Sequence, residues 1–145
     1  MSTSELVQTM LRLLPRIYIT ASDIPSDDLD FGYIDQALDE TSYDSVRQQL
    51  ASVFGKNDSY LEVFEEDMKY SDTPIAATVS ENLADLFQVF YNFIETVKDA
   101  PEEVADGAFT SVKEDFANYW SQILCNVLRQ LNNLNYNSDL LNEEI

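Results

Sequence analysis

Histidine is absent from this 145-residue chain, and glycine is scarce. Without histidine the chain cannot build a serine or cysteine triad of the usual kind, a zinc-binding helix pair or a Glu-x-x-His di-iron helix. The three glycines, Gly32, Gly55 and Gly107, stand far apart, so the sequence has no glycine-rich phosphate-binding loop. These absences argue against most enzyme classes and favour a non-enzymatic protein.

Basic residues are also few: 8 against 27 acidic residues, for a formal net charge of -19. Such a charge repels nucleic acid phosphates and anionic membrane surfaces, so we expect no direct binding to nucleic acid or to membranes. An unidentified protein partner, if basic, or a cation would be attracted instead. The acidic residues also keep a protein in solution without any further role.

The chain has a single cysteine, Cys125, and therefore no intrachain disulfide. A reducing compartment fits this best, so we expect a cytoplasmic protein. Cys125 lies in an apolar helical segment with no histidine to activate it, which predicts a buried, inert thiol.

Hydrophobic periodicity predicts an all-α fold: a compact bundle of four to five main helices in one domain, residues 1–136. We expect helices over residues 4–20, 41–55, 78–98 and 101–134, and a short one over 33–38. Ser4 is the expected N-cap of the first helix, and Pro15 predicts a kink or break inside it. The acidic tail, residues 137–145, is expected to fray.

The helix over residues 78–98 has one aromatic side and one wholly polar side. Phe87, Tyr91 and Ile94 widen its apolar stripe, while Asp85 and Asn92 lie on the polar side. A short connection near residue 100 makes the last two helices a long antiparallel hairpin.

Four residues of the last helix are the candidate binding residues. This polar stripe consists of Tyr119, Gln122, Asn126 and Arg129. In the favoured interpretation Arg129 pairs with a carboxylate, and Gln122 and Asn126 hydrogen-bond to loop backbone within residues 56–75. In the alternative, Tyr119 and Arg129 anchor an interface.

An enzymatic alternative uses paired carboxylates. All-helical nucleotide pyrophosphohydrolases hold Mg²⁺ with carboxylates three or four residues apart, a spacing that places both on one helix face. This chain offers Glu62 with Glu65 and Glu81 with Asp85. Such pairs are expected by chance among 27 acids, and no basic cluster is set to hold a nucleotide's phosphates. A third hypothesis is an acidic nucleic-acid mimic that binds basic proteins.

Two stretches carry a family resemblance. One is SENLADLFQVFYNFI, residues 80–94. The other is a C-terminal string made of Phe116, Tyr119, Trp120, Gln122, Leu124, Asn126, Leu128, Arg129, Leu131, Leu134 and Tyr136. Together they resemble an uncharacterised bacterial family, domain of unknown function 5063, over most of the chain. The resemblance implies a compact all-helical protein and no activity. Ser121 replaces a glycine of the relatives, and Asn132 stands near a position where they often carry histidine.

Overall fold

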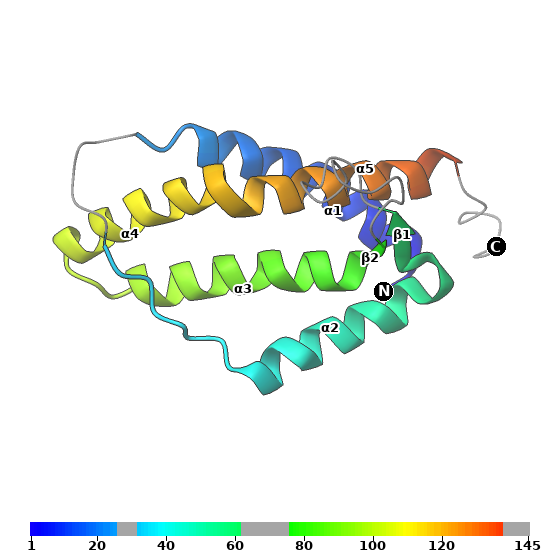
Figure 1. The fold of residues 1–145 in the computed structure, drawn as a ribbon, viewed down its shortest axis with the longest axis horizontal. Coiled ribbons are helices and arrows are strands. Elements are labelled where there is room, and N and C mark those ends of the chain that lie inside the picture. The colour runs from blue at the N-terminus through cyan, green and yellow to red at the C-terminus, as the bar shows by residue number, and fades with distance from the viewer. Residues whose placement is uncertain (26–31, 62–75, 138–145) are drawn as a thin grey trace, which may run out of the picture.

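The structure, a computed structural model, describes residues 1–25, 32–61 and 76–137, and it confirms the all-α prediction (Figure 1). Its elements are α1 (Thr3–Ser22), α2 (Glu40–Phe54), the short 3-10 turn η1 (Gly55–Asn57), β1 (Ser59–Leu61), β2 (Ala76–Thr78), α3 (Val79–Val97), α4 (Glu102–Asp115), the π-helical turn η3 (Phe116–Trp120) and α5 (Ser121–Asn137). α4, η3 and α5 follow one another without a gap, and we call them the α4–α5 arm. The arm runs back along α3, so the predicted antiparallel hairpin is confirmed (Figure 1).

The N-cap of α1 is Ser2 rather than the predicted Ser4, because Ser2 and Glu5 form a capping box. The Glu5 amide donates to the Ser2 hydroxyl oxygen at 3.1 Å. Of the kink or break predicted at Pro15, the break is wrong, since α1 continues through Pro15 to Ser22. A proline inside a helix costs about 3 kcal/mol. Burial of the α1 side chains next to α5, including the fully buried Leu14, offsets that cost.

The short helix expected over residues 33–38 is not present. Instead residues 32–39, which we call the crossing segment, are extended and run across α3 to the start of α2 (Figure 1). The Asn92 amide oxygen accepts hydrogen bonds from the N–H groups of Ala37 and Leu38, both at 2.9 Å. Helix α3 therefore satisfies backbone donors that a local helix would have satisfied internally. Helix α2 then starts at its N-cap, Asp39.

Two glycines allow the crossing segment to touch the arm. The Gly32 N–H donates to the Gly107 carbonyl oxygen at 2.9 Å, and the Ser111 hydroxyl donates to the Gly32 carbonyl oxygen at 2.7 Å. A Cβ on Gly32 would lie 2.5 Å from the Gly107 carbonyl carbon. Gly107 is thus buried inside α4, and the irregularity of the arm falls at η3.

Strands β1 and β2 form a small antiparallel sheet that leads directly into α3. Asp58, next to β1, accepts hydrogen bonds from the Ser80 N–H and the Ser80 hydroxyl, each at 2.7 Å. These bonds satisfy groups in the first turn of α3, where no intrahelical acceptor exists. Thr78 caps the same helix, since its hydroxyl oxygen accepts from the Glu81 N–H at 3.1 Å.

The core is aliphatic along α5 and aromatic around η3. Leu124, Val127 and Leu131 on α5 are fully buried. At η3, Phe116 packs edge-to-face on Trp120 with ring centroids 4.6 Å apart. The Trp120 indole N–H donates to the Val112 carbonyl oxygen at 3.3 Å, which fixes the orientation of the indole.

The acidic tail predicted to fray, residues 137–145, lies outside the described residues apart from Asn137, which ends α5. In the part of the chain that the structure describes, no helix is long and apolar enough to cross a membrane.

The Gly32 contact gives a first prediction. Gly32→Ala should lower the free energy of unfolding by about 1 to 3 kcal/mol, because the added methyl group overlaps Gly107 backbone that cannot move aside cheaply. Urea denaturation measures the change. Gln36→Ala, at an exposed position of the same segment, is the control and should change stability by less than about 0.5 kcal/mol. Equal effects of both substitutions would contradict the close contact.

Candidate functional site

The polar stripe predicted on the last helix does not form one exposed face. Tyr119 lies on η3 and is 52% exposed, Gln122 and Arg129 are exposed, and Asn126 is only 6% exposed. Arg129 donates from Nη2 to the Leu61 carbonyl oxygen at 3.1 Å, which ties α5 to β1. The structure thus brings Arg129 to backbone of the 56–75 region, a contact assigned from sequence to Gln122 and Asn126.

The structure brings Tyr119 close to the predicted carboxylate Asp85, which in turn lies near Glu81 on the same helix. A second tyrosine, Tyr43 of α2, hydrogen-bonds to Asp85: its hydroxyl donates to Oδ1 at 2.5 Å. Tyr43 is not among the site residues that the sequence predicted. A tyrosine four residues after the Asp39 cap gave no signal of its partner on α3, because that partner is 42 residues away.

Burial dominates the electrostatics of this cluster. Burial raises the pKa of Asp85, and the nearby Glu81 charge raises it further, while the Tyr43 hydrogen bond opposes both. The pKa of Tyr43 is raised far above its ordinary value by burial and then by the Asp85 carboxylate. Burial and the Asp85 charge also raise the pKa of Tyr119. The raised pKa values favour the protonated forms of these three side chains. The cluster is therefore poorly suited to act as a base unless a cation lies beside it.

Next to this cluster is a groove of about 270 Å³. It is lined by Ile34, Gln36, Gln88, Val89, Asn92, Val112, Asp115 and Tyr119. Burial, followed by the Glu114 charge, raises the pKa of Asp115. The amides can donate and accept hydrogen bonds, but the Asn92 oxygen is already used by the crossing segment. The described residues that line this groove supply hydrogen-bonding groups, and none of them is a nucleophile paired with a base.

Of the four carboxylates predicted to bind Mg²⁺, two lie among the residues that the structure describes. Glu62 and Glu65 lie outside the described residues. Glu81 is exposed, and Asp85 is half-buried and bonded to Tyr43. Within residues 1–25, 32–61 and 76–137 no group of three or more side chains is arranged to hold a metal ion. A magnesium site therefore stays a prediction from the sequence.

Cys125 is exposed, so the prediction of a buried thiol is wrong. Its neighbour Leu124 is fully buried, and the turn of about 100° per residue carries Cys125 off that buried stripe. Cys125 lines a shallow surface pocket that also includes Pro15 and Arg129.

A larger, almost wholly apolar groove of about 470 Å³ lies between α1, α3 and the arm. This apolar groove is lined by Leu13, Arg16, Ile17, Thr20, Ala21, Ile24, Phe90, Phe93, Ile94, Phe109, Val112 and Trp120. Ile94 is 55% exposed, and Leu13 and Phe109 are each 42% exposed. Since α1 and α3 each pack on the arm rather than closely on each other, the groove stays open above Trp120.

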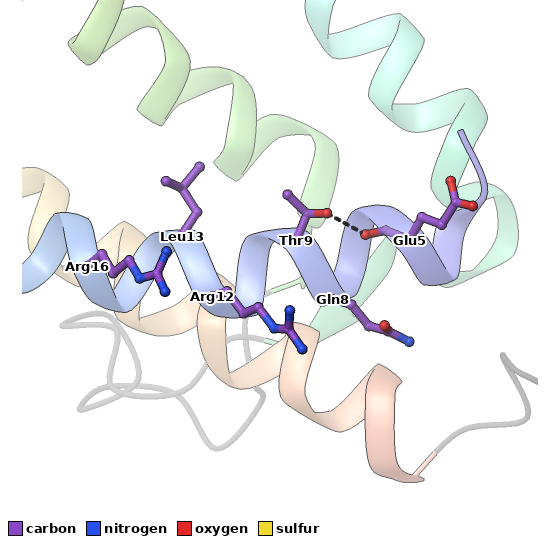
Figure 2. Close-up of a pocket in the computed structure, with 6 residues that line it drawn as sticks. All are labelled: Glu5, Gln8, Thr9, Arg12, Leu13 and Arg16. Carbon is purple, nitrogen blue, oxygen red and sulfur yellow. Dashed lines mark hydrogen bonds between the residues drawn. The ribbon is translucent and has the colours of Figure 1, made fainter.

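The outer edge of the groove is the exposed side of α1. Figure 2 shows the shallow pocket on this side, with Arg12 and Arg16 projecting from successive turns and Leu13 pointing away from both guanidinium groups. The Thr9 hydroxyl bonds back to the Glu5 carbonyl oxygen at 2.8 Å (Figure 2). Arg16 lines both this pocket and the apolar groove, so a cation stands at the groove's edge.

Comparisons with known proteins give a family and a solved fold. The family model described as "Domain of unknown function (DUF5063)" matches residues 1–137. The crystal structure of protein BF1032 from Bacteroides fragilis is similar at 27% identity with a TM-score of 0.79. That similarity covers 95% of this chain and 80% of the other. No curated protein matches the sequence.

The buried carboxylate gives a pH prediction. Because the pKa of folded Asp85 lies above its ordinary 3.8, the folded state holds a proton there that the unfolded state has already lost. Stability from this group is present at low pH and is lost as pH rises through the raised pKa. The free energy of unfolding of the wild type, minus that of Asp85→Asn, should therefore grow from about pH 7 to about pH 4.5.

Urea denaturation across that range measures the difference. Tyr43→Phe is the matched variant: it removes the hydrogen bond that lowers the Asp85 pKa and should move the dependence to higher pH. A difference that stays flat, or that grows with rising pH, would contradict the assignment.

The Arg129 tie gives another prediction. Arg129→Met should cost about 1 kcal/mol, since it removes one charge-assisted hydrogen bond to the Leu61 carbonyl oxygen at an exposed position. Hydrogen exchange of the β1–β2 amides should become faster, while exchange in α2 should not change. Arg129→Lys, which keeps a donor, is the control. Unchanged exchange in the β1–β2 sheet would argue against the tie.

Proposed function

Because the chain belongs to the DUF5063 family, whose description assigns no activity, we propose from its surface that it is a non-enzymatic protein-interaction module. The observation that carries this proposal is the apolar groove. Contiguous apolar surface of this kind on a folded domain marks protein–protein sites more often than scattered exposed residues do. The partner is a protein that places apolar side chains in the groove.

The shape of the groove supports this function. Its floor is made of Trp120, Phe90 and Val112, which the core holds in place. Its rim carries Ile94 and Phe109, whose side chains are half in water. Burying one such side chain on binding is worth about 1.5 to 3 kcal/mol. A rigid floor with exposed apolar walls can supply affinity without ordering a loop.

The residue types around the groove fit binding better than catalysis. Among the described residues that line the groove, only Arg16 and Thr20 are of polar types, and the remaining ones are aliphatic or aromatic. A central apolar pocket with a polar edge is the usual arrangement of a protein interface. At longer range, the net charge of -19 favours partners that are basic overall.

Capture from a lysate of the source organism, followed by mass spectrometry, tests the proposal. The wild-type chain should recover a partner that Ile94→Asp recovers at least tenfold less, since a carboxylate on the groove wall cannot be desolvated cheaply. Val104→Asp is the matched control: Val104 is also an exposed aliphatic residue, but it does not line the groove. Circular dichroism should show equal helix content in all three proteins.

Two outcomes would argue against the proposal. Equal recovery of the same proteins by the wild type, Ile94→Asp and Val104→Asp would show that the groove is not the contact. Basic nucleic-acid-binding proteins whose capture survives Ile94→Asp but is abolished by salt would favour the acidic mimic instead.

A further inference from the structure

We infer that the apolar groove binds an amphipathic helix whose carboxylates lie along the flank that faces α1. This inference rests on the proposed function and adds the chemistry of the partner. Three observations carry it: the helical walls of the groove, Arg16 at its α1 edge with Arg12 one turn before it, and the lack of acidic residues in α1 between Glu5 and Ser22.

The walls favour a helix as the occupant. Leu13, Ile17 and Ala21 line the groove from successive turns of α1, which extends it over about 12 Å at 1.5 Å per residue. Phe90, Phe93 and Ile94 line it from the facing side of α3. Ridges of side chains on two helices leave a groove into which the ridge of a third helix fits. No strand lines the groove among the described residues, so added-strand binding has no edge to use there.

Among the described residues that line the groove, Arg16 of α1 is the charged one. Arg12 and Arg16 are four residues apart and so project from the same side of α1 (Figure 2). After Glu5, no acidic residue occurs in the chain until Asp23. The facing wall of α3 presents Phe93 and Ile94, which carry no charge.

The two arginines are not neutralised within the described parts of the chain. There, ion pairs join Arg47 with Asp44 and Lys98 with Glu95, and neither Arg12 nor Arg16 takes part in one. In a chain with 19 more acids than bases, Arg16 at the groove's edge and Arg12 one turn before it mark a place where an added carboxylate is favoured. A guanidinium group can bind that carboxylate through two parallel hydrogen bonds.

The overall charge limits the partner further. A helix rich in acids over its whole surface would be repelled by the net charge of -19. The carboxylates must therefore be confined to the flank over Arg12 and Arg16, at spacings of three or four residues. The rest of the partner is apolar toward the groove and neutral or basic toward water.

Three designed helical peptides test this inference. All carry the same Leu and Phe stripe, and one flank holds two residues, four apart, that are Glu, Gln or Lys. The Glu peptide should bind the wild-type chain about three- to tenfold more tightly than the Gln peptide, and the Lys peptide most weakly. This order opposes the long-range attraction of the chain for positive charge, so net charge cannot produce it. Fluorescence anisotropy at low salt measures the three dissociation constants.

Charge reversal provides the control. Arg12→Glu combined with Arg16→Glu should invert the order, so that the Lys peptide binds most tightly. Arg47→Glu combined with Lys56→Glu changes the net charge equally, but away from the groove, and should preserve the preference for the Glu peptide. Both double variants alter exposed or half-exposed side chains, and their melting temperatures verify that they fold.

The outcomes separate this inference from the proposed function. Equal binding of all three peptides that Ile94→Asp abolishes would leave the groove as the site and overturn the acidic flank. Tightest binding of the Lys peptide to the wild type would also overturn it. The absence of binding by all three peptides would overturn the inference as well. In that case partner capture would still test the proposed function. A dimer in sedimentation that Ile94→Asp dissociates would assign the groove to a second copy of this chain.

Discussion

The edge-to-face packing of aromatic rings around Trp120 is the interaction on which the arrangement of the helices depends. Phe90 of α3 meets Trp120 with ring centroids 5.3 Å apart, and Tyr18 of α1 meets Phe116 at 5.0 Å. Phe116 in turn contacts Trp120 across η3. Edge-to-face pairs are stable at these separations and fix the angle between rings. Two helices thus rest on one aromatic centre, and its bulk holds them apart, which opens the apolar groove.

The π-helical turn explains how one helix can present that centre. A π turn inserts an extra residue and shifts the side chains that follow relative to those that precede. Here it lets Phe116 and Trp120 both point into the core while Tyr119 stays exposed between them. The aliphatic stripe of α5 then continues through Leu124, Val127 and Leu131. Register along the arm therefore changes where the aromatic floor gives way to the aliphatic core.

The sequence predicted what depends on neighbours along the chain and missed what depends on distant partners. Hydrophobic periodicity located α3 and the hairpin, and α2 ends at its C-cap Gly55, where the helix predicted over residues 41–55 ends. The crossing segment was mistaken for a helix because its backbone donors bond to Asn92, a side chain more than 50 residues away. Cys125 was misplaced because an apolar window does not tell which side of a helix is covered. The Tyr43–Asp85 hydrogen bond could not be predicted from the local sequence pattern.

Helix α3 shows why amphipathic pattern alone could not locate the candidate surface. Its polar side is used inside the molecule: Asn92 holds the crossing segment, Asp85 accepts from Tyr43, and Asn82 accepts from the Tyr60 hydroxyl. Its widened aromatic side, with Phe87, Tyr91 and Ile94, is left partly in water. Internal hydrogen bonds thus use the side of α3 that the hydrophobic pattern assigns to solvent. The apolar side stays partly exposed, and burying exposed apolar surface is favourable. A partner would therefore gain more free energy by binding at the groove than at the polar stripe of α5.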